Sequence, residues 1–454
     1  MAVEYDLVIL GGTLAGRCAA LQAVGYGARV ALIEPPGLFL LNQRHRYLLQ
    51  ALQQLAKGQQ TQAVSGWFGG ATVGKSDWNW QAVLEWSAIA SETQAADLSV
   101  AVMGAKGVDV VLEMPERLSK TSVTRTSVAR TIAVTTPSRQ IKARAILAAF
   151  GLSPNVLQPL IMATRLPETV MVWGGEVRSL QWAEALAQMG AKVVLQTAAV
   201  LPGWDERVQG LVRSQLTTAG VSFLDPADTL AANVRADCTL RFGTEQPALV
   251  LPKAAYRHSE RSPYLTVNRK LQTRIPRLFA CGAAIEENRD TILTHQDISV
   301  AVKNALFLPT GRIQPDQPIK AGNRFAMAGL TQAQADSRYG ARACMEENIQ
   351  PNSTDLSKVP SPSYCQLVCV DRRLVGIHLV GDHAADYISP LATFLDQPID
   401  RLCRSIPMTV SSTSPQNLLE VAQATARQHQ QSRWQVGRWK RDWSENWFNW
   451  RRSR

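Results

Sequence analysis

The fold of this chain is decided by the stretch YDLVILGGTLAG, residues 5–16. Residues 5–10 are mostly apolar, which predicts a short buried strand, and the glycine-rich run after them predicts a tight turn. A helix is expected over residues 17–26, and a second parallel strand over residues 28–33 ends at Glu34, 18 residues after Gly16. This order is typical of a βαβ unit that binds a dinucleotide, with the final carboxylate accepting from both ribose hydroxyls.

The loop between the first strand and the helix holds the candidate binding residues. Gly11 would permit the tight turn, Gly16 would let helix and strand pack closely, and the helix N-terminus would offer N–H groups to a pyrophosphate. Thr13 replaces the middle glycine of G-x-G-x-x-G, where the backbone would approach the phosphates. A purely structural turn is the alternative to an ADP-type ligand. The predicted binding residues are Gly11, Gly12, Thr13, Leu14, Ala15, Gly16 and Glu34.

Composition limits the class of protein. The chain has 454 residues, of which 46% are hydrophobic and 19% charged, so we expect two to four domains with a sizeable core. No apolar run approaches a bilayer span, and Glu4 and Asp6 stand where a secretory signal would be positive. The 7 cysteines are an odd number without zinc spacing. These features predict a cytoplasmic globular protein without a metal site.

Positive charge is concentrated at the C-terminus. Lysine and arginine number 48 against 37 acidic residues, and residues 430–454 hold nearly half of the net +11. The remaining charge is too dilute to predict a nucleic-acid surface on the main body.

Residues 430–454 also carry a regular stripe of aromatic side chains. On a helix the four indoles would lie within an arc of about 80°. The stripe could fold back onto its own chain or a dimer partner, lie on an anionic membrane surface, or dock on a protein partner. No nucleic-acid partner is expected. The four residues are Trp439, Trp443, Trp447 and Trp450.

Several later segments follow in a characteristic order. Residues 107–111 and 145–151 read as strands, and Phe150 stands in the second of them where an Ala-Thr-Gly signature has threonine. Further matching runs lie at residues 267–273, 276–282, 329–335, 367–371 and 376–384. Together with residues 5–34, they resemble the FAD-dependent pyridine nucleotide-disulfide oxidoreductases, the family of dihydrolipoamide dehydrogenase, glutathione reductase and mercuric reductase. The resemblance extends over roughly residues 5–420.

The resemblance implies an α/β chain with two Rossmann-like FAD/NAD(P)-binding domains and a C-terminal α+β dimerisation domain, and therefore a homodimer. The alternation of strands and helices agrees with this fold class. The implied boundaries are 1–158 and 265–320 for the FAD-binding domain, 159–264 for the NAD(P)-binding-like domain, 325–425 for the dimerisation domain and 430–454 for the tail.

The catalytic groups of the family are missing. Its members pass electrons from a nicotinamide through flavin to a Cys-x4-Cys pair, whose position corresponds here to residues 35–46, where there is no cysteine. Cys365 and Cys369 are predicted to be buried structural residues. The family's His-Pro-Thr-x-Ser-Glu segment corresponds to residues 406–411, with Ile406 and Ser411 in place of histidine and glutamate. We expect no thiol-disulfide chemistry by the family mechanism, and the catalytic residues remain unknown.

The cofactor sites are altered to different degrees. Residues 174–181 keep two glycines of the family's second dinucleotide motif, but Glu176 follows them and Gln196 ends the next strand, so NAD(P)H binding is not expected. Where the family has a Gly-Asp pair at the FAD site, this chain has Gly282-Ala283, so the carboxylate is missing. The remaining contacts predict that FAD is retained. The resemblance adds Gly151, Gly282 and Ala283 to the predicted FAD-binding residues.

Aromatic residues near the altered disulfide segment are predicted to pack against the core rather than cover the flavin; they are Trp67, Trp78, Trp80 and Trp86. His45, flanked by two arginines, is predicted to be exposed.

Two functions follow from these observations. The first is a flavoprotein that transfers electrons without a disulfide. The alternative is a catalytically silent dimeric scaffold that docks on a membrane surface or a protein partner through its tail, in the cytoplasm or peripherally on a membrane.

Overall fold

The computed structural model describes a large part of the chain, with gaps. The described residues are 5–67, 79–120, 132–151, 154–227, 235–242, 264–285, 294–311, 319–350, 363–382, 384–405, 422 and 425–426. Contacts divide the chain into two units, one formed by Met1–Pro202 and Arg213–Pro315, the other by Gly203–Val212 and Asp316–Arg454. Each unit is described separately.

The first sheet of the first unit contains the predicted N-terminal strands. Its strand order is β3-β2-β1-β6-β5-β4, and β11 pairs with β6. The strands β1, β2, β3, β6 and β11 are parallel, while β5 and β4 extend the sheet in antiparallel fashion. Their bounds are Tyr5–Leu10 (β1), Val30–Ile33 (β2), Val108–Val111 (β3), Arg117–Lys120 (β4), Ile132–Thr135 (β5), Gln140–Ala148 (β6) and Leu278–Ala280 (β11).

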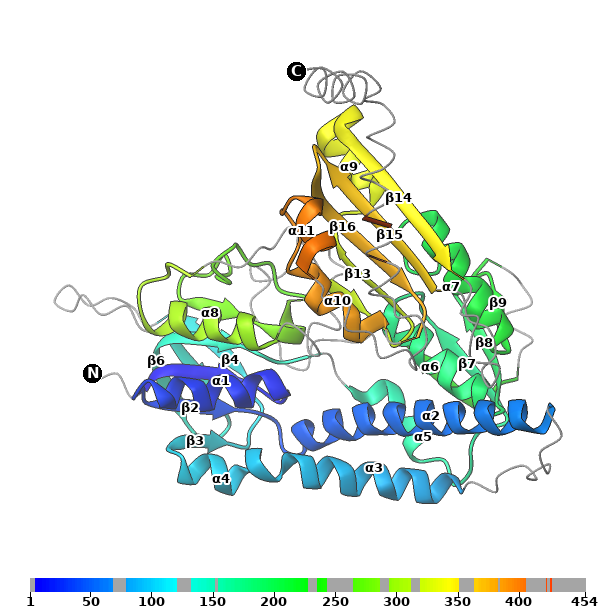
Figure 1. Ribbon diagram of the computed structural model, residues 1–454. Coiled ribbons are helices and arrows are strands. Elements are labelled where there is room, and N and C mark those ends of the chain that lie inside the picture. Colours follow the sequence, from blue (N-terminus) through cyan, green and yellow to red (C-terminus); the bar gives the residue numbers. More distant parts are fainter. Residues whose placement is uncertain are drawn as a thin grey trace, which may run out of the picture. The chain divides into compact units, whose positions relative to one another are not determined.

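Both faces of this sheet are buried. Helices α1 (Leu14–Gly25) and α8 (Thr294–Leu306) contact each other and the sheet, as Figure 1 shows. Leu7 and Ile9 point into the cluster with these helices, whereas Val8 and Leu10 join a second cluster on the opposite face. Such two-sided burial is typical of parallel sheets and explains why residues 5–10 are almost continuously apolar.

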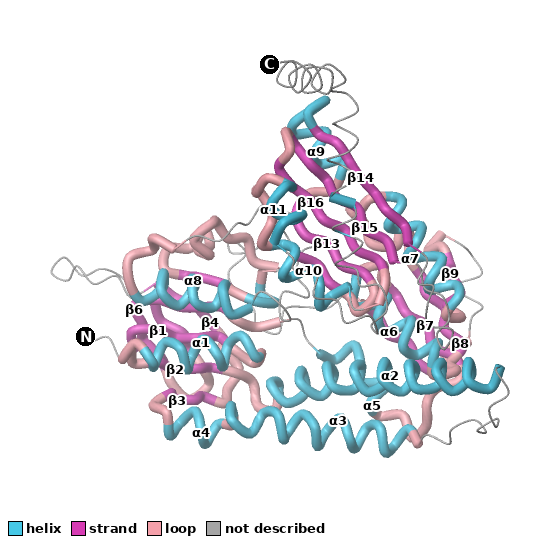
Figure 2. The backbone as a smooth tube through the Cα atoms, viewed as in Figure 1, coloured by secondary structure: helices cyan, strands magenta, loops and turns pink. Residues whose placement is uncertain are grey.

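A long helical hairpin follows β2. Helix α2 (Leu38–Trp67) packs along α3 (Trp80–Ala95), as seen in Figure 2. Trp80 is buried and donates from Nε1 to the Ala163 carbonyl at 3.0 Å, so its predicted packing role is confirmed. Trp86 is 50% exposed, and the same prediction is wrong for it. The Trp67 side chain and Trp78 lie outside the described residues. Shorter elements are η1 (Ala96–Leu98), α4 (Val100–Ala105), η2 (Pro154–Leu157) and α5 (Gln158–Ile161).

The second sheet has the order β10-β7-β8-β9, and all of its strands are parallel. Helix α6 packs on β7 and β8. The bounds are Thr169–Trp173 (β7), Val177–Gln188 (α6), Lys192–Gln196 (β8), Glu206–Thr218 (α7), Val221–Leu224 (β9) and Cys238–Arg241 (β10). Two Rossmann-like sheets in a mixed α/β chain confirm the predicted fold class.

The second unit is built on an antiparallel sheet with the order β12-β13-β16-β15-β14. Cys365 and Cys369 in β15 are fully buried, and burial raises the pKa of Cys365 to about 12, so its thiol stays protonated at neutral pH. The bounds are Ile319–Ala321 (β12), Phe325–Gly329 (β13), Gln332–Tyr339 (α9), Gly340–Arg342 (η6), Ala343–Gln350 (β14), Ser363–Val370 (β15), Arg373–Val380 (β16), Ala384–Ala392 (α10) and Ile399–Ser405 (α11).

A buried polar network fixes the segment Gly203–Val212 to this sheet. The Asp205 carboxylate accepts from the side-chain amide of Gln366 at 2.7 Å and from the backbone N–H of Gln332 at 3.1 Å. His378 Nδ1 lies 3.2 Å from the same carboxylate. Burial lowers the pKa of His378, although Asp205 and a backbone contact at Leu330 oppose the shift. One partly buried carboxylate therefore satisfies the Gln366 amide and the Gln332 N–H, while His378 Nδ1 lies near it without a hydrogen bond.

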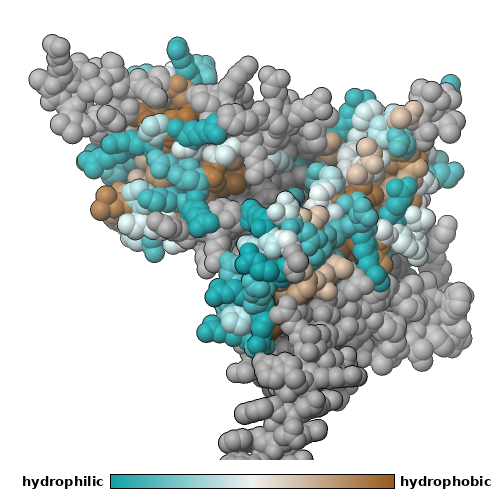
Figure 3. Space-filling view, turned by 90° about the horizontal axis from the view of Figure 1, so that it is seen from above, coloured by the Kyte–Doolittle hydropathy of each residue, from teal (hydrophilic) through white to brown (hydrophobic). Residues whose placement is uncertain are grey.

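Several sequence predictions lie outside the described residues: the segment 406–411 and the tail 430–454 with its tryptophans. Within the described part of the chain, no helix combines the length and the apolar character needed to cross a membrane. On the face shown in Figure 3, hydrophobic residues, in brown, form separate patches among hydrophilic ones.

We predict that Asp205→Ala destabilises the second unit by about 2–3 kcal/mol, because it leaves the buried Gln366 amide and the Gln332 N–H without their acceptor. Hydrogen exchange of the amides in β13 and β16 measures this effect. The control is Asp336→Ala, which removes an exposed carboxylate from the same unit and should change exchange by less than about 0.5 kcal/mol. Equal effects of the two substitutions would contradict the role assigned to Asp205.

Candidate functional site

The turn between β1 and α1 depends on Gly12 and Gly16 for different reasons. Gly12 has a φ of +105°, so Gly12 rather than Gly11 supplies the left-handed conformation of the turn. A Cβ on Gly16 would lie 3.0 Å from Gly11 Cα and 3.3 Å from the Ala149 carbonyl oxygen. The predicted close packing of helix against strand at Gly16 is therefore present.

Thr13 uses its side chain within the turn. As the N-cap of α1, its hydroxyl accepts from the backbone N–H of Gly16 at 3.3 Å. The same hydroxyl donates to the Ala149 carbonyl at 2.6 Å, just after β6. Thr13 therefore ties the start of α1 to the neighbouring strand, a role that glycine could not fill.

Three predicted residues from distant parts of the chain converge beside this turn. A Cβ on Gly151 would lie 3.6 Å from the Ala283 Cβ and 3.7 Å from the Thr13 Cγ2. Gly151, Ala283 and Thr13 follow β6, β11 and β1, which are neighbouring parallel strands whose carboxyl ends meet at one edge. The Thr13 methyl group thus lies where the resemblance places a glycine, and the Ala283 methyl group lies where it places an aspartate carboxylate.

The predicted ribose-binding residue is already engaged by another side chain. Glu34 is 1% exposed and forms an ion pair with Arg17, the fourth residue of α1. The Arg17 guanidinium donates to one carboxylate oxygen from a terminal nitrogen and to the other from Nε, at 3.4 Å. A second terminal nitrogen donates to the Leu98 carbonyl at 2.6 Å, and the guanidinium lies 3.7 Å above the Phe39 ring. Sequence reasoning missed Arg17 and Phe39, which no motif marks.

The start of α2 is fixed on the same turn. Asn42 donates from its side-chain amide to the Gly12 carbonyl at 2.8 Å. The Leu38 side chain packs so closely on Gly12 that an added Cβ would lie 2.4 Å from Leu38 Cδ2. These contacts hold Phe39 beside Arg17.

These residues fit the two halves of an FAD molecule unequally. The glycine turn and the N-terminus of α1 fit a pyrophosphate. The adenosine half does not fit the arrangement as it stands, because the Glu34 carboxylate is covered and both of its oxygens accept from Arg17. A ribose would reach Glu34 only after Arg17 has moved.

The segment expected to carry the redox disulfide is the start of α2 and holds His45 instead of a thiol. His45 is 6% exposed, so its predicted exposure is wrong; α2 packs against both α3 and α6, which cover it. Neither ring nitrogen has a hydrogen-bond partner among the described residues. Burial, and then the charges of Arg178 and Arg44, lower the pKa of His45 to about 3. The ring is neutral at pH 7 and is poorly matched to general acid–base catalysis there.

The second dinucleotide loop is occupied by its own backbone. A Cβ on Gly175 would lie 1.9 Å from the Ala199 carbonyl oxygen, and the Leu201 N–H donates to the Gly175 carbonyl at 2.7 Å. Glu176 is the N-cap residue of α6 and makes no side-chain capping bond. Gln196 is buried, and its Oε1 has no hydrogen-bond partner among the described residues. One buried acceptor without a partner therefore lies at the carboxyl end of β8.

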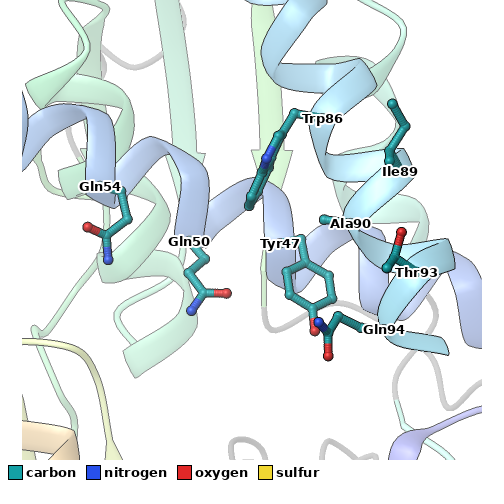
Figure 4. Close-up of a pocket in the computed structure, with 8 residues that line it drawn as sticks. All are labelled: Tyr47, Gln50, Gln54, Trp86, Ile89, Ala90, Thr93 and Gln94. Atoms are coloured by element: carbon teal, nitrogen blue, oxygen red, sulfur yellow. The ribbon is translucent and has the colours of Figure 1, made fainter. Parts of the chain in front are cut away.

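A separate hollow of 490 Å³ lies between α2 and α3, and none of the predicted FAD-binding residues lines it (Figure 4). The rings of Tyr47 and Trp86 meet there edge to face, with centroids 6.4 Å apart. No carboxylate, imidazole or thiol is among its lining residues, which are Tyr47, Gln50, Gln54, Trp86, Ile89, Ala90, Thr93 and Gln94. In the described ranges, no three histidine, cysteine or acidic side chains are grouped as metal ligands.

Comparisons with known proteins agree with the fold. The family model for pyridine nucleotide-disulphide oxidoreductases matches residues 5–305. A dihydrolipoyl dehydrogenase of Bacillus subtilis is 23% identical over 447 residues, covering 87% of this chain and 93% of its own. A glutathione reductase of Burkholderia cepacia is 24% identical over 443 residues, with 86% and 92% covered.

Two solved structures share the architecture. LpdA from Mycobacterium tuberculosis superposes with a TM-score of 0.69 at 18% identity, covering 93% of this chain and 99% of its own. A Cu(II) complex of the HOCl-induced flavoprotein disulfide reductase RclA from Escherichia coli gives 0.64 at 16% identity, with the same coverage. At these identities the likeness concerns the fold alone.

We predict that His45→Leu removes part of the acid sensitivity of the fold. The pKa of His45 falls from 6.5 to about 3 on folding, so as the pH drops below 6.5 the unfolded chain takes up a proton that the folded chain refuses. Between pH 7 and 5 this costs the wild type about 2 kcal/mol. Urea unfolding across that range should show a variant whose stability declines less. Parallel curves for variant and wild type would contradict the assignment.

We predict that Thr13→Val destabilises the first unit by about 1–2 kcal/mol, because it leaves the Gly16 N–H and the Ala149 carbonyl without the hydroxyl that satisfies them. Thr13→Ser keeps the hydroxyl and is the matched control, with a loss below that of valine. Urea unfolding measures both. A valine variant as stable as the wild type would show that the hydroxyl bonds contribute nothing.

Proposed function

We propose, because this chain belongs to the pyridine nucleotide-disulphide oxidoreductase family, that it is a flavoprotein that transfers electrons without a redox disulfide. The family consists of FAD-dependent oxidoreductases. The observation that carries the proposal is the segment 35–46, which forms the start of α2 beside the cofactor turn and contains no thiol. The only imidazole there, His45, is buried and neutral at pH 7.

FAD is the cofactor that the first sheet supports. The residues that would hold it are Gly11, Gly12, Thr13, Leu14, Ala15, Gly16, Glu34, Gly151, Gly282 and Ala283. The turn at Gly12 and the N-terminus of α1 would bind the pyrophosphate through backbone N–H groups. Bound FAD would supply hydride or single-electron transfer, while this chain would orient it and exclude water.

The electron donor is proposed to be something other than NAD(P)H bound in the family manner. Support comes from Ala199, whose carbonyl closes on Gly175, and from Glu176, which places a negative charge at the N-terminus of α6. Both features oppose a pyrophosphate at the second loop.

We further propose a cytoplasmic homodimer whose tail, residues 430–454, docks on a membrane surface or a protein partner. The support is the sequence pattern of four tryptophans flanked by arginines and the family's C-terminal domain.

A second function, a catalytically silent scaffold, is favoured by one observation. The carboxylate that would recognise the adenosine ribose is buried in an ion pair with Arg17. A chain that never bound FAD would need such an internal partner for Glu34.

We predict that the purified chain binds added FAD, acquires visible flavin absorption and is bleached by dithionite. Turnover of lipoamide, glutathione disulfide or mercuric ion should not exceed the rate without protein, because the segment 35–46 holds no cysteine that could attack. Leu14→Glu is the control. A glutamate in the first turn stabilises α1 through the helix dipole, so the variant should fold. It also places negative charge beside the proposed pyrophosphate and should weaken FAD binding at least about tenfold.

The two possible failures are separate. Absence of FAD binding at saturating concentration would overturn the flavoprotein proposal and leave the scaffold. Rapid reduction of lipoamide, glutathione disulfide or mercuric ion would show instead that the chain carries out thiol-disulfide chemistry, contrary to the proposal.

A further inference from the structure

We propose that Arg17 and Phe39 act as an internal occupant of the adenosine half of the FAD site, so that FAD binds only in competition with the contact between Arg17 and Glu34. These three residues are called the Arg17 latch. The inference rests on the proposed function, since it assumes that the first sheet takes up FAD. It adds a regulatory feature that the loss of the disulfide does not imply.

The position of Glu34 means that a ribose would compete with Arg17 for its carboxylate. It follows β2, directly beside β1, and its Oε2 lies 3.5 Å from where a Cβ on Gly11 would be. This is the place at which a βαβ unit offers a carboxylate to ribose hydroxyls. The latch and the cofactor therefore need the same two oxygen atoms.

The closed latch gives each guanidinium nitrogen and both carboxylate oxygens a partner without a ligand. Arg17 donates to both oxygens of Glu34 and to the Leu98 carbonyl, while the flat face of its guanidinium rests on the Phe39 ring. All three latch residues are at most 5% exposed. A planar cation on an aromatic ring thus occupies the space next to the ribose acceptor, where the nucleoside would otherwise lie.

Charge makes this competitor effective. The bonds from Arg17 to Glu34 join two ions, whereas those from ribose hydroxyls join a neutral group to an ion, and the former are the stronger kind. Opening the latch also exposes the guanidinium, which must find water or another acceptor. The apparent affinity for FAD is therefore reduced by the fraction of molecules in which the latch is open.

The latch discriminates between ligands by their adenosine group. FAD and ADP both carry the ribose that needs Glu34, whereas FMN carries the flavin and one phosphate but no adenosine. Weakening the latch should therefore raise the affinities for FAD and ADP and leave the affinity for FMN unchanged. This contrast separates a specific competitor from a general loosening of the domain.

The experiment uses the full chain with two substitutions of Arg17. Arg17→Met removes the guanidinium but keeps apolar contact with Phe39. Arg17→Lys keeps the charge that compensates Glu34 and loses the forked geometry, so it remains informative should the methionine variant fail to fold. Arg144→Met is the matched control, because it removes an exposed arginine that pairs with Asp6 in the same unit. Calorimetric titration measures the binding of FAD, ADP and FMN to each.

The expected result is a rise of roughly 10- to 100-fold in the affinity of Arg17→Met for FAD and ADP, with a smaller rise for Arg17→Lys. FMN binding and the control variant should match the wild type. If both Arg17 variants bind FAD and ADP with the same affinities as the wild type, the latch is overturned but the flavoprotein proposal is not. A parallel gain for FMN would also overturn it. Absence of FAD binding in every variant would overturn the proposed function and the latch together.

Discussion

A carboxylate that is 1% exposed needs donors, and the need of Glu34 for a partner organises the first sheet's binding edge. Arg17 meets that need from the second turn of α1, and Phe39 and the Leu98 carbonyl hold its guanidinium in place. The start of α2 is then set by Phe39, with Asn42 bonded to the Gly12 carbonyl. One ion pair thus links the turn, two helices and the end of β2.

The backbone arrangement of this site could be predicted from the sequence, but the ion pair between Arg17 and Glu34 could not. The order strand, glycine turn, helix, strand and acid follows from apolar runs and from Gly16, because helix and strand meet too closely there for any side chain. The reach of Arg17 to Glu34 depends on a long side chain choosing one of many rotamers, which no periodicity records. The same holds for Asp205, whose contacts with Gln366 and His378 span more than 150 positions.

The error over His45 has a specific physical cause. Two flanking arginines made the segment look like a solvated helix face, yet α2 packs against both α3 and α6, and His45 is one of its buried positions. Arg44 and Arg178 then act on His45 as nearby cations and help to keep the ring neutral. His45 is therefore buried, neutral and without a partner among the described residues, which is the environment of a packed side chain rather than of an acid or base.

The two Rossmann-like sheets differ in what lies against their glycine loops, and the difference bears on function. At Gly175 the neighbouring group is backbone: an added Cβ would lie 1.9 Å from the Ala199 carbonyl oxygen, and the Leu201 N–H donates to the Gly175 carbonyl, so widening this loop requires the backbone to move. At Glu34 the obstruction is a side chain, and rotating Arg17 away leaves the backbone of the βαβ unit intact. Rotamer changes are fast and small compared with loop refolding. The first sheet therefore needs the smaller rearrangement to take up a nucleotide.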